Sequence, residues 1–202
     1  PYDYPGFSTE KELKVNNDHF DQALIYAEGA ENIGITGEGC IDGQGRELAL
    51  TIDSLHVENR AYWNNDGINI SDCKDVRISN CFINSADDGI CLKSHNRGAW
   101  NDRVSISNCH IISSASAIKF GTESLGGFKN VTIDNIRIKD TFRSAIAIES
   151  VDGAEIENVQ VSNVHAVNTG NAIFIRLGHR SGEQPGYLRN VTIKDMYVEV
   201  CL

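Results

Sequence analysis

The sequence predicts an all-β protein, a single-stranded, right-handed parallel β-helix of short strands and turns. Three observations lead to this fold class. One alternating apolar pattern recurs at a nearly constant interval, each interval holds a second short strand, and no helical periodicity lies between them. In such a fold each strand stacks on its copy one period earlier at about 4.8 Å, and the inward side chains form one continuous core.

The N-terminal part fits the repeat least well. Residues 1–18 are polar and irregular, so we assign residues 19–202 to a single β-helix domain. Residues 23–27 and 32–36 have the composition of strands, and residues 37–45 that of turns around a short strand. If Gly37 aligns with the column of bend residues described next, only 17 residues separate it from Ser54, which predicts a skipped corner or a shortened coil.

The first strand of each period alternates apolar and polar residues, and a polar residue, most often Asn, occupies its middle. The copies span residues 50–57, 75–83, 103–111, 130–138, 158–166 and 190–198. Asn and Asp tolerate the left-handed backbone of a tight bend and can hydrogen-bond to a stacked neighbour, so we interpret the polar column as structural. Its members are Ser54, Asn80, Asn108, Asn135, Asn163 and Asp195, which lie 26, 28, 27, 28 and 32 residues apart.

The six cysteines include no C-x-x-C pair, so we expect neither a metal site nor a redox pair. Cys81 and Cys109 directly follow members of the polar column. The equivalent positions in other periods are apolar, namely Leu55, Ile136, Val164 and Met196. Both cysteines are therefore predicted to be thiols of the core.

Composition restricts the possible partners. The formal charge of −10 argues against nucleic acid or an anionic membrane, because both require clustered Lys and Arg, and a neutral or weakly acidic ligand fits better. The sequence contains no apolar run long enough for a transmembrane helix and no signal-peptide pattern. It begins with Pro1, which indicates a processed product or a fragment. We expect a monomer that is secreted or periplasmic.

The second strands, at residues 67–70, 89–92, 117–120, 145–148 and 172–175, each follow a polar residue. Two of these residues are Asp66 and Asp88, which should stack about 5 Å apart, with Asp87 at the bend beside them. Two like charges at that distance repel by about 3 kcal/mol at an effective dielectric constant of about 20, which should raise the pKa of at least one carboxyl group. Such a cluster suits acid and base catalysis at a glycosidic bond. A structural stack of turn-forming Asp residues and a calcium site are the alternatives.

The Asn64-x-Asp66 and Asp87-Asp88 motifs on a β-helix resemble those of glycoside hydrolase family 28, the polygalacturonase-like family, and the likeness runs from about Ala23 to Val198. The resemblance implies a pectin-lyase-like solenoid that cleaves pectic polysaccharides with inversion and without metal or other cofactor. It implies that Asp87 is the general acid, that Asp66 and Asp88 activate water, and that Asn64 positions sugar or water. Inversion calls for acid and base carboxylates about 6.5–9.5 Å apart, so we expect Asp87 to lean away from one partner.

The sequence departs from the family pattern at two motifs. The Gly-His-Gly motif of the family falls on residues 115–117, where Ser116 replaces the histidine, and its Arg-Ile-Lys motif falls on residues 147–149, which end in Glu149. The cleft therefore lacks the usual pair of cations and gains an acid. We expect exo action on a chain end, or on a neutral or mixed pectic side chain, rather than cleavage within polygalacturonate.

Further charged residues are predicted to contact substrate together with Asn64 and Ser116: Lys93, Lys119, Glu123, Glu149, Arg176 and His179. Lys93, Glu149 and Arg176 share a column, and Lys119 and Glu123 are placed on the intervening turn. Lys119 or Arg176 could hold one substrate carboxylate. Alternatively, Glu149 and Arg176 pair at the surface, worth about 0–1 kcal/mol. Trp63 and Trp100 either stack on sugar rings or cap the core.

Two other functional classes stay open from the sequence. Polysaccharide lyases also use β-helices, although this is an analogy of fold alone. The missing His and Arg-x-Lys matches also fit a non-catalytic glycan-binding β-helix.

Overall fold

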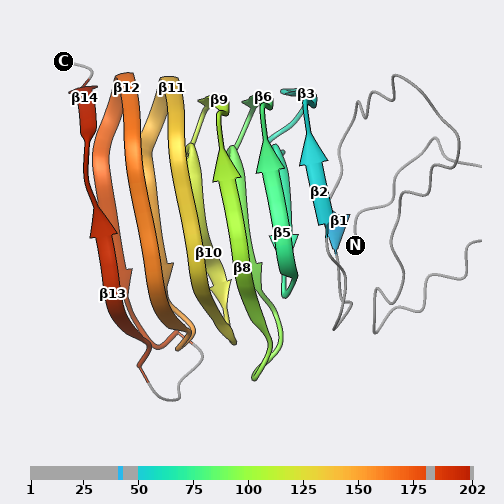
Figure 1. Cartoon of the computed structure of the whole chain (residues 1–202), viewed down its shortest axis with the longest axis vertical. Helices are drawn as coiled ribbons and strands as arrows, with labels where there is room; N and C mark the ends of the chain where they lie inside the picture. The colour runs from blue at the N-terminus through green and yellow to red at the C-terminus, as the bar shows by residue number, and fades with distance from the viewer. Residues whose placement is uncertain (1–40, 43–49, 181–184, 201–202) are drawn as a thin grey trace, which may run out of the picture.

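The chain winds as a right-handed parallel β-helix, and every strand pairs in parallel with its copy in the next coil (Figure 1). The computed structural model describes residues 41–42, 50–180 and 185–200. The predicted irregular segment 1–18, the predicted strands 23–27 and 32–36, and Gly37 lie outside the described residues. The strands are β1 (Ile41–Asp42), β2 (Leu50–Asp53), β3 (His56–Asn59), β4 (Ile68–Ser71), β5 (Lys74–Ser79), β6 (Phe82–Ser85), β7 (Ile90–Ser94), β8 (Trp100–Ser107), β9 (His110–Ser113), β10 (Ile118–Ser124), β11 (Gly127–Ser150), β12 (Glu155–Leu177), β13 (Tyr187–Ile193) and β14 (Met196–Val200).

Each coil contributes to three faces. The first face, which we call the site sheet, contains β1, β4, β7, β10 and the last segments of β11 and β12. The second contains β2, β5, β8, the first segments of β11 and β12, and β13. The third contains β3, β6, β9, the middle segments of β11 and β12, and β14. The predicted first strand of each period therefore covers the second and third faces, and the predicted second strand forms the site sheet.

The core is a stack of inward side chains in register. On the site sheet Ile70, Leu92, Phe120 and Ile148 occupy one column, and all four are fully buried. Truncating one of them to Ala would cost about 2–5 kcal/mol, because the neighbouring coils cannot collapse into the space. Cys81 and Cys109 are both 2% exposed, which confirms that they are core thiols.

The bends follow the predicted polar column. All six members have a left-handed backbone, with φ between 53° and 56°. The side chains also form a ladder: the Asn108 amide donates to Asn80 Oδ1 over 3.3 Å, and the Asn135 amide donates to Asn108 Oδ1 over 2.8 Å. The ladder is interrupted at Asn163, which donates to Asp134 Oδ1 instead. The prediction of structural corner residues is confirmed.

The choice between a skipped corner and a shortened coil depends on Gly37 and residues 43–49, which lie outside the described residues. Ile41 pairs with Ile70 on the site sheet, 29 residues later, which is a full period. Ile41 and Asp42 therefore belong to the site sheet, whereas Ser54 lies at the corner between the second and third faces.

Candidate active site

Three carboxylates meet where two strands of the site sheet begin. Asp66 lies two residues before Ile68 in β4, and Asp88 lies two residues before Ile90 in β7, and these two isoleucines are in register. One carboxylate oxygen from each of Asp66, Asp87 and Asp88 lies within 4.8 Å of the others. Asp66 and Asp88 are buried, with 9% and 7% of their surface exposed, and Asp87 is half-buried. The predicted stacking of these acids is observed.

Buried polar side chains fix the backbone of this cluster. The Asn59 amide donates to the Asp66 carbonyl over 2.7 Å, and the hydroxyl groups of Ser85 and Ser113 donate to the Asp87 carbonyl over 2.8 and 2.6 Å. These three residues were missed in the sequence. A signal for them existed, because β3, β6 and β9 each end in a small polar residue at this position.

Two lysines neutralise part of the cluster. Lys93 Nζ lies 2.9 Å from Asp66 Oδ2 and 3.6 Å from Glu123 Oε2. Lys119 Nζ lies 2.8 Å from Glu149 Oε1 and 3.6 Å from Asp88 Oδ2. Asp87, in contrast, forms no ion pair with any of the described residues. The three acids therefore differ in their environment although they are neighbours.

The pKa of Asp88 is raised, as expected for at least one member of the cluster. Burial is the largest cause, and the charges of Asp66 and Asp87 add to it, while Lys119 and the Ser116 N–H, which donates to Asp88 Oδ1 over 2.9 Å, act in the opposite direction. Repulsion among the carboxylates is thus a smaller cause than the sequence suggested. Burial alone would lower the pKa of Lys119, yet its acidic neighbours Asp88 and Glu149 raise it overall, so this lysine stays charged.

The other predicted contact residues lie along the outer face of the site sheet. Glu149 is in register with Arg176, as predicted. Two expectations are wrong. Lys119 and Glu123 lie in β10 rather than on a turn, because the strand continues to Ser124, which pairs with Ser94. Glu149 does not pair with Arg176 at the surface; it is only 7% exposed and binds Lys119 on the opposite side.

The side chains of three predicted contact residues form no hydrogen bond or ion pair with the described residues. Asn64 is exposed at a left-handed position with φ of 58°, two residues before Asp66. Arg176 and His179 are exposed at the end of the site sheet formed by β12. Of the two tryptophans, Trp63 is 92% exposed near the cluster, whereas Trp100 packs on the second face beneath Lys129 Nζ, 4.5 Å from the ring.

The carboxylate spacing is shorter than expected. One oxygen of Asp87 lies within 4.8 Å of oxygens of both Asp66 and Asp88, so Asp87 does not lean away from either partner. The geometry of the acids alone therefore does not indicate inversion.

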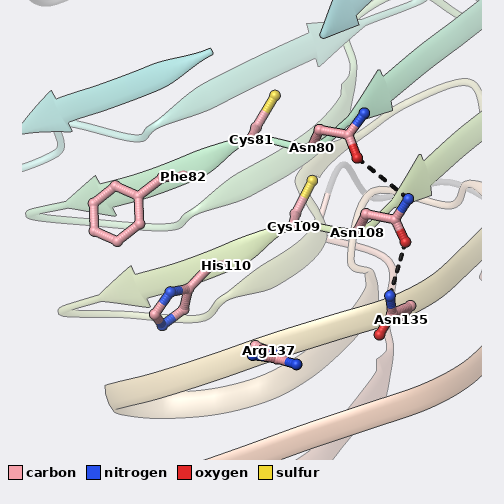
Figure 2. Close-up of a pocket in the computed structure, with 8 residues that line it drawn as sticks. All are labelled: Asn80, Cys81, Phe82, Asn108, Cys109, His110, Asn135 and Arg137. Carbon is pink, nitrogen blue, oxygen red and sulfur yellow. Dashed lines mark hydrogen bonds between the residues drawn. The ribbon is translucent and has the colours of Figure 1, made fainter. Parts of the chain in front are cut away.

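A cavity of about 380 Å³ lies elsewhere, at the corner between the second and third faces (Figure 2). It contains the Asn80–Asn108–Asn135 ladder and the rings of Phe82 and His110, whose centroids are 5.3 Å apart. None of its lining residues belongs to the carboxylate cluster. This hollow is a feature of the corner and not of the candidate active site.

The fold and the cluster together define a pectin-lyase-like β-helix of the polygalacturonase-like class. The chain belongs to the glycosyl hydrolases family 28, whose sequence model matches residues 48–200. The family expectation from the acidic motifs is confirmed.

Two individual proteins resemble the chain, one in sequence and one in fold. A "Probable polygalacturonase" from Vitis vinifera is 26% identical over 133 residues, which is 66% of this chain and 22% of that protein. The crystal structure of a hyperthermoactive exopolygalacturonase from Thermotoga maritima superposes with a TM-score of 0.58 at 24% identity, over 70% of this chain and 35% of that one. The second likeness concerns the fold. The chain thus spans well under half the length of both proteins.

The described residues include no helix with the length and apolarity needed to cross a membrane.

Proposed function

We propose that this chain carries the catalytic cleft of a glycoside hydrolase that cleaves glycosidic bonds in pectin-like plant polysaccharides or oligosaccharides. The observation that carries the proposal is the meeting of Asp66, Asp87 and Asp88 within 4.8 Å on one sheet of a family 28 fold. Asp87 is the general acid, Asp66 and Asp88 activate the attacking water, and the anomeric configuration is inverted. Membership in a hydrolase family favours hydrolysis over a lyase reaction. The described residues offer no specific support for a lyase reaction.

The different environments of the acids support these roles. Asp87 is the most exposed of the three and forms no ion pair with the described residues, and the Asp88 N–H, which donates to Asp87 Oδ1 over 2.8 Å, orients its carboxyl group beside the proposed bases. Asp66 forms an ion pair with Lys93, whose Nζ lies 2.9 Å from Asp66 Oδ2, and this contact fixes the position of the carboxylate proposed to activate water. The short carboxylate spacing does not by itself support inversion, which rests on the family resemblance.

Hydrolysis is proposed to proceed without metal. Lys93 and Lys119 place ammonium groups on Asp66 and Asp88, so two of the three carboxylates already have cationic partners. A calcium ion would have to compete with these fixed charges for the same oxygens.

The charge of the cleft supports a neutral or mixed substrate. The site holds five acidic side chains and two lysines, Lys93 and Lys119, and this excess of negative charge disfavours a polyanionic chain in the buried part. The acids are Asp66, Asp87, Asp88, Glu123 and Glu149. One coil further, Arg176 is exposed and has no acidic partner among the described residues. We therefore propose a neutral glycosyl unit at the carboxylates and at most one uronate near Arg176. A site that accepts at most one uronate favours exo action over cleavage within a polygalacturonate chain. We also propose that the protein acts as a secreted monomer, where pectic glycans occur.

The first test compares wild type with Asp87→Asn on a panel of pectic polysaccharides and oligosaccharides, measured as reducing-sugar release. We expect the variant to lose activity by about 10²–10⁴-fold, because the leaving oxygen is no longer protonated. Asp140→Asn is the matched control, since Asp140 is exposed at a bend with φ of 52°, which Asn also tolerates.

The same reactions decide the finer parts of the proposal. Proton NMR of the fresh product reports inversion or retention, chelator treatment reports metal dependence, and the panel reports whether neutral or mixed chains are preferred. Full activity in Asp87→Asn would overturn the acid assignment. Binding of a glycan by wild type without any release would instead indicate a non-catalytic β-helix.

A further inference from the structure

A buried lysine and a buried glutamate face each other beside Asp88. Lys119 and Glu149 are 5% and 7% exposed, and their charged atoms are 2.8 Å apart. They come from successive coils, since Lys119 is in register with Ala147 on β11 and Glu149 lies two residues further along that strand. Removing two charges from water is costly, so a pair at this depth needs close partners to persist.

Lys119 has a second acidic neighbour, Asp88, at 3.6 Å. Its ammonium therefore lies between a carboxylate of the proposed catalytic cluster and one outside it. The remaining ionisable groups around Asp88 are Asp66 and Asp87 in the cluster, Lys93 on Asp66, Glu123 beside Lys93, and the fully buried thiol of Cys91 in β7. Lys119 is the described cation closest to Asp88.

We infer that Lys119 is a positioning residue, held by Glu149, that keeps Asp88 ionised for water activation and does not contact the substrate. The inference rests on the proposed function, because it assigns Lys119 a role in the same reaction. It also replaces the predicted substrate contacts of Lys119 and Glu149 by an internal one. The Lys119 ammonium and the Glu149 carboxylate are in contact with each other, and both side chains are buried.

Opposite effects of the two partners distinguish this role from simple packing. Lys119→Met removes the cation that lowers the pKa of Asp88, so the acidic limb of the pH profile of kcat/KM should move upward by about 1 pH unit. Glu149→Gln removes a negative charge and leaves Lys119 to Asp88, so the same limb should move downward. A purely structural role would lower activity in both variants without shifting the limb in opposite directions.

The experiment measures pH profiles for both variants. If Lys119→Met folds poorly, the double variant Lys119→Met/Glu149→Gln replaces it, because Glu149 is then not left as a buried charge without Lys119. Lys129→Met, on the second face, is the matched control and should leave the profile unchanged. An unshifted limb in folded Lys119→Met, or a rise in KM confined to carboxylate-bearing substrates, would overturn the inference.

A direct titration separates this inference from the proposed function. The ¹³C carboxyl resonance of Asp88, assigned with Asp88→Asn, can be followed with pH in each variant without any substrate. If wild type hydrolyses nothing, the proposed function fails, and the titration still decides whether Lys119 controls Asp88. The same midpoint in wild type and Lys119→Met would then contradict the inference.

Discussion

At the scale of single residues, two glycines beside the acids allow close contact between the backbones of successive coils. Gly67 and Gly89 directly follow Asp66 and Asp88, and their N–H groups donate to the carbonyls of Asp88 and Ser116, each over 2.8 Å. A Cβ atom on Gly89 would lie 2.5 Å from the Ala117 carbonyl oxygen, which is backbone and has little freedom to move. The absence of a side chain therefore allows two coils to approach at the site.

The variant Gly89→Ala should be clearly destabilised, by about 1–3 kcal/mol, because overpacking forces the coils apart. The measurement is the urea unfolding midpoint. Gly178→Ala is the matched control, since its Cβ would meet neighbours only at 3.5 Å or more. Equal midpoints for the two variants would show that the coils separate at no cost.

At the scale of elements, the corners combine two requirements that the sequence satisfies with one residue type. Asn108 has φ of 55°, and its side chain donates to Asn80 and accepts from Asn135. The Asn108 side chain thus contributes to the stability of the corner in two separate ways, by tolerating the left-handed backbone and by hydrogen-bonding to neighbouring coils.

Two substitutions separate these contributions. Asn108→Gly loses the ladder but adopts the left-handed backbone without strain, whereas Asn108→Ala loses the ladder and is also strained. We expect Asn108→Ala to be less stable than Asn108→Gly by about 1 kcal/mol in urea unfolding. If Ala proved as stable as Gly, the backbone strain would not limit the corner.

The elements also show where prediction succeeded. Strict alternation in residues such as Val131, Ile133, Ile136 and Ile138 gave both faces of the first strand, because inward positions must be apolar in every coil. On the outer face of the site sheet, no apolar alternation marks which side chains are buried. Lys119 lies between the core residues Ile118 and Phe120 in β10 and points outward, yet it is only 5% exposed and its ammonium group lies beside Asp88 and Glu149. An alternating pattern cannot distinguish such a position from one exposed to solvent.

At the scale of the whole molecule, carboxylates tie successive coils together. Asp53 and Asp134 precede equivalent corner residues, and each accepts hydrogen bonds from a Ser hydroxyl and an Asn amide of the next coil. For Asp134 the donors are Ser162 at 2.6 Å and Asn163 at 2.7 Å, and these bonds hold its pKa below the ordinary value of 3.8.

A lowered pKa in the folded state gives stability that is present above pH 3.8 and is lost as the pH falls through the folded value. The urea concentration at the unfolding midpoint of wild type should therefore decrease as the pH is lowered below about 4. Asp134→Asn should be less stable than wild type at pH 6, and the difference should shrink at pH 2.5. Glu199→Gln, an exposed site on β14, is the control for loss of one charge. A difference for Asp134→Asn that is independent of pH would contradict this account.

The sequence alone determined the parallel β-helix, the corner residues, the core thiols, and the stacking of Asp66 with Asp88. All of these follow from periodicity, because a repeat of about one coil places equivalent residues one above another. The tertiary structure decided which charges pair and which remain free. Lys93, Lys119 and Glu149 come from different coils, and their partners depend on burial and on distances of a few ångströms, to which a one-dimensional pattern is insensitive.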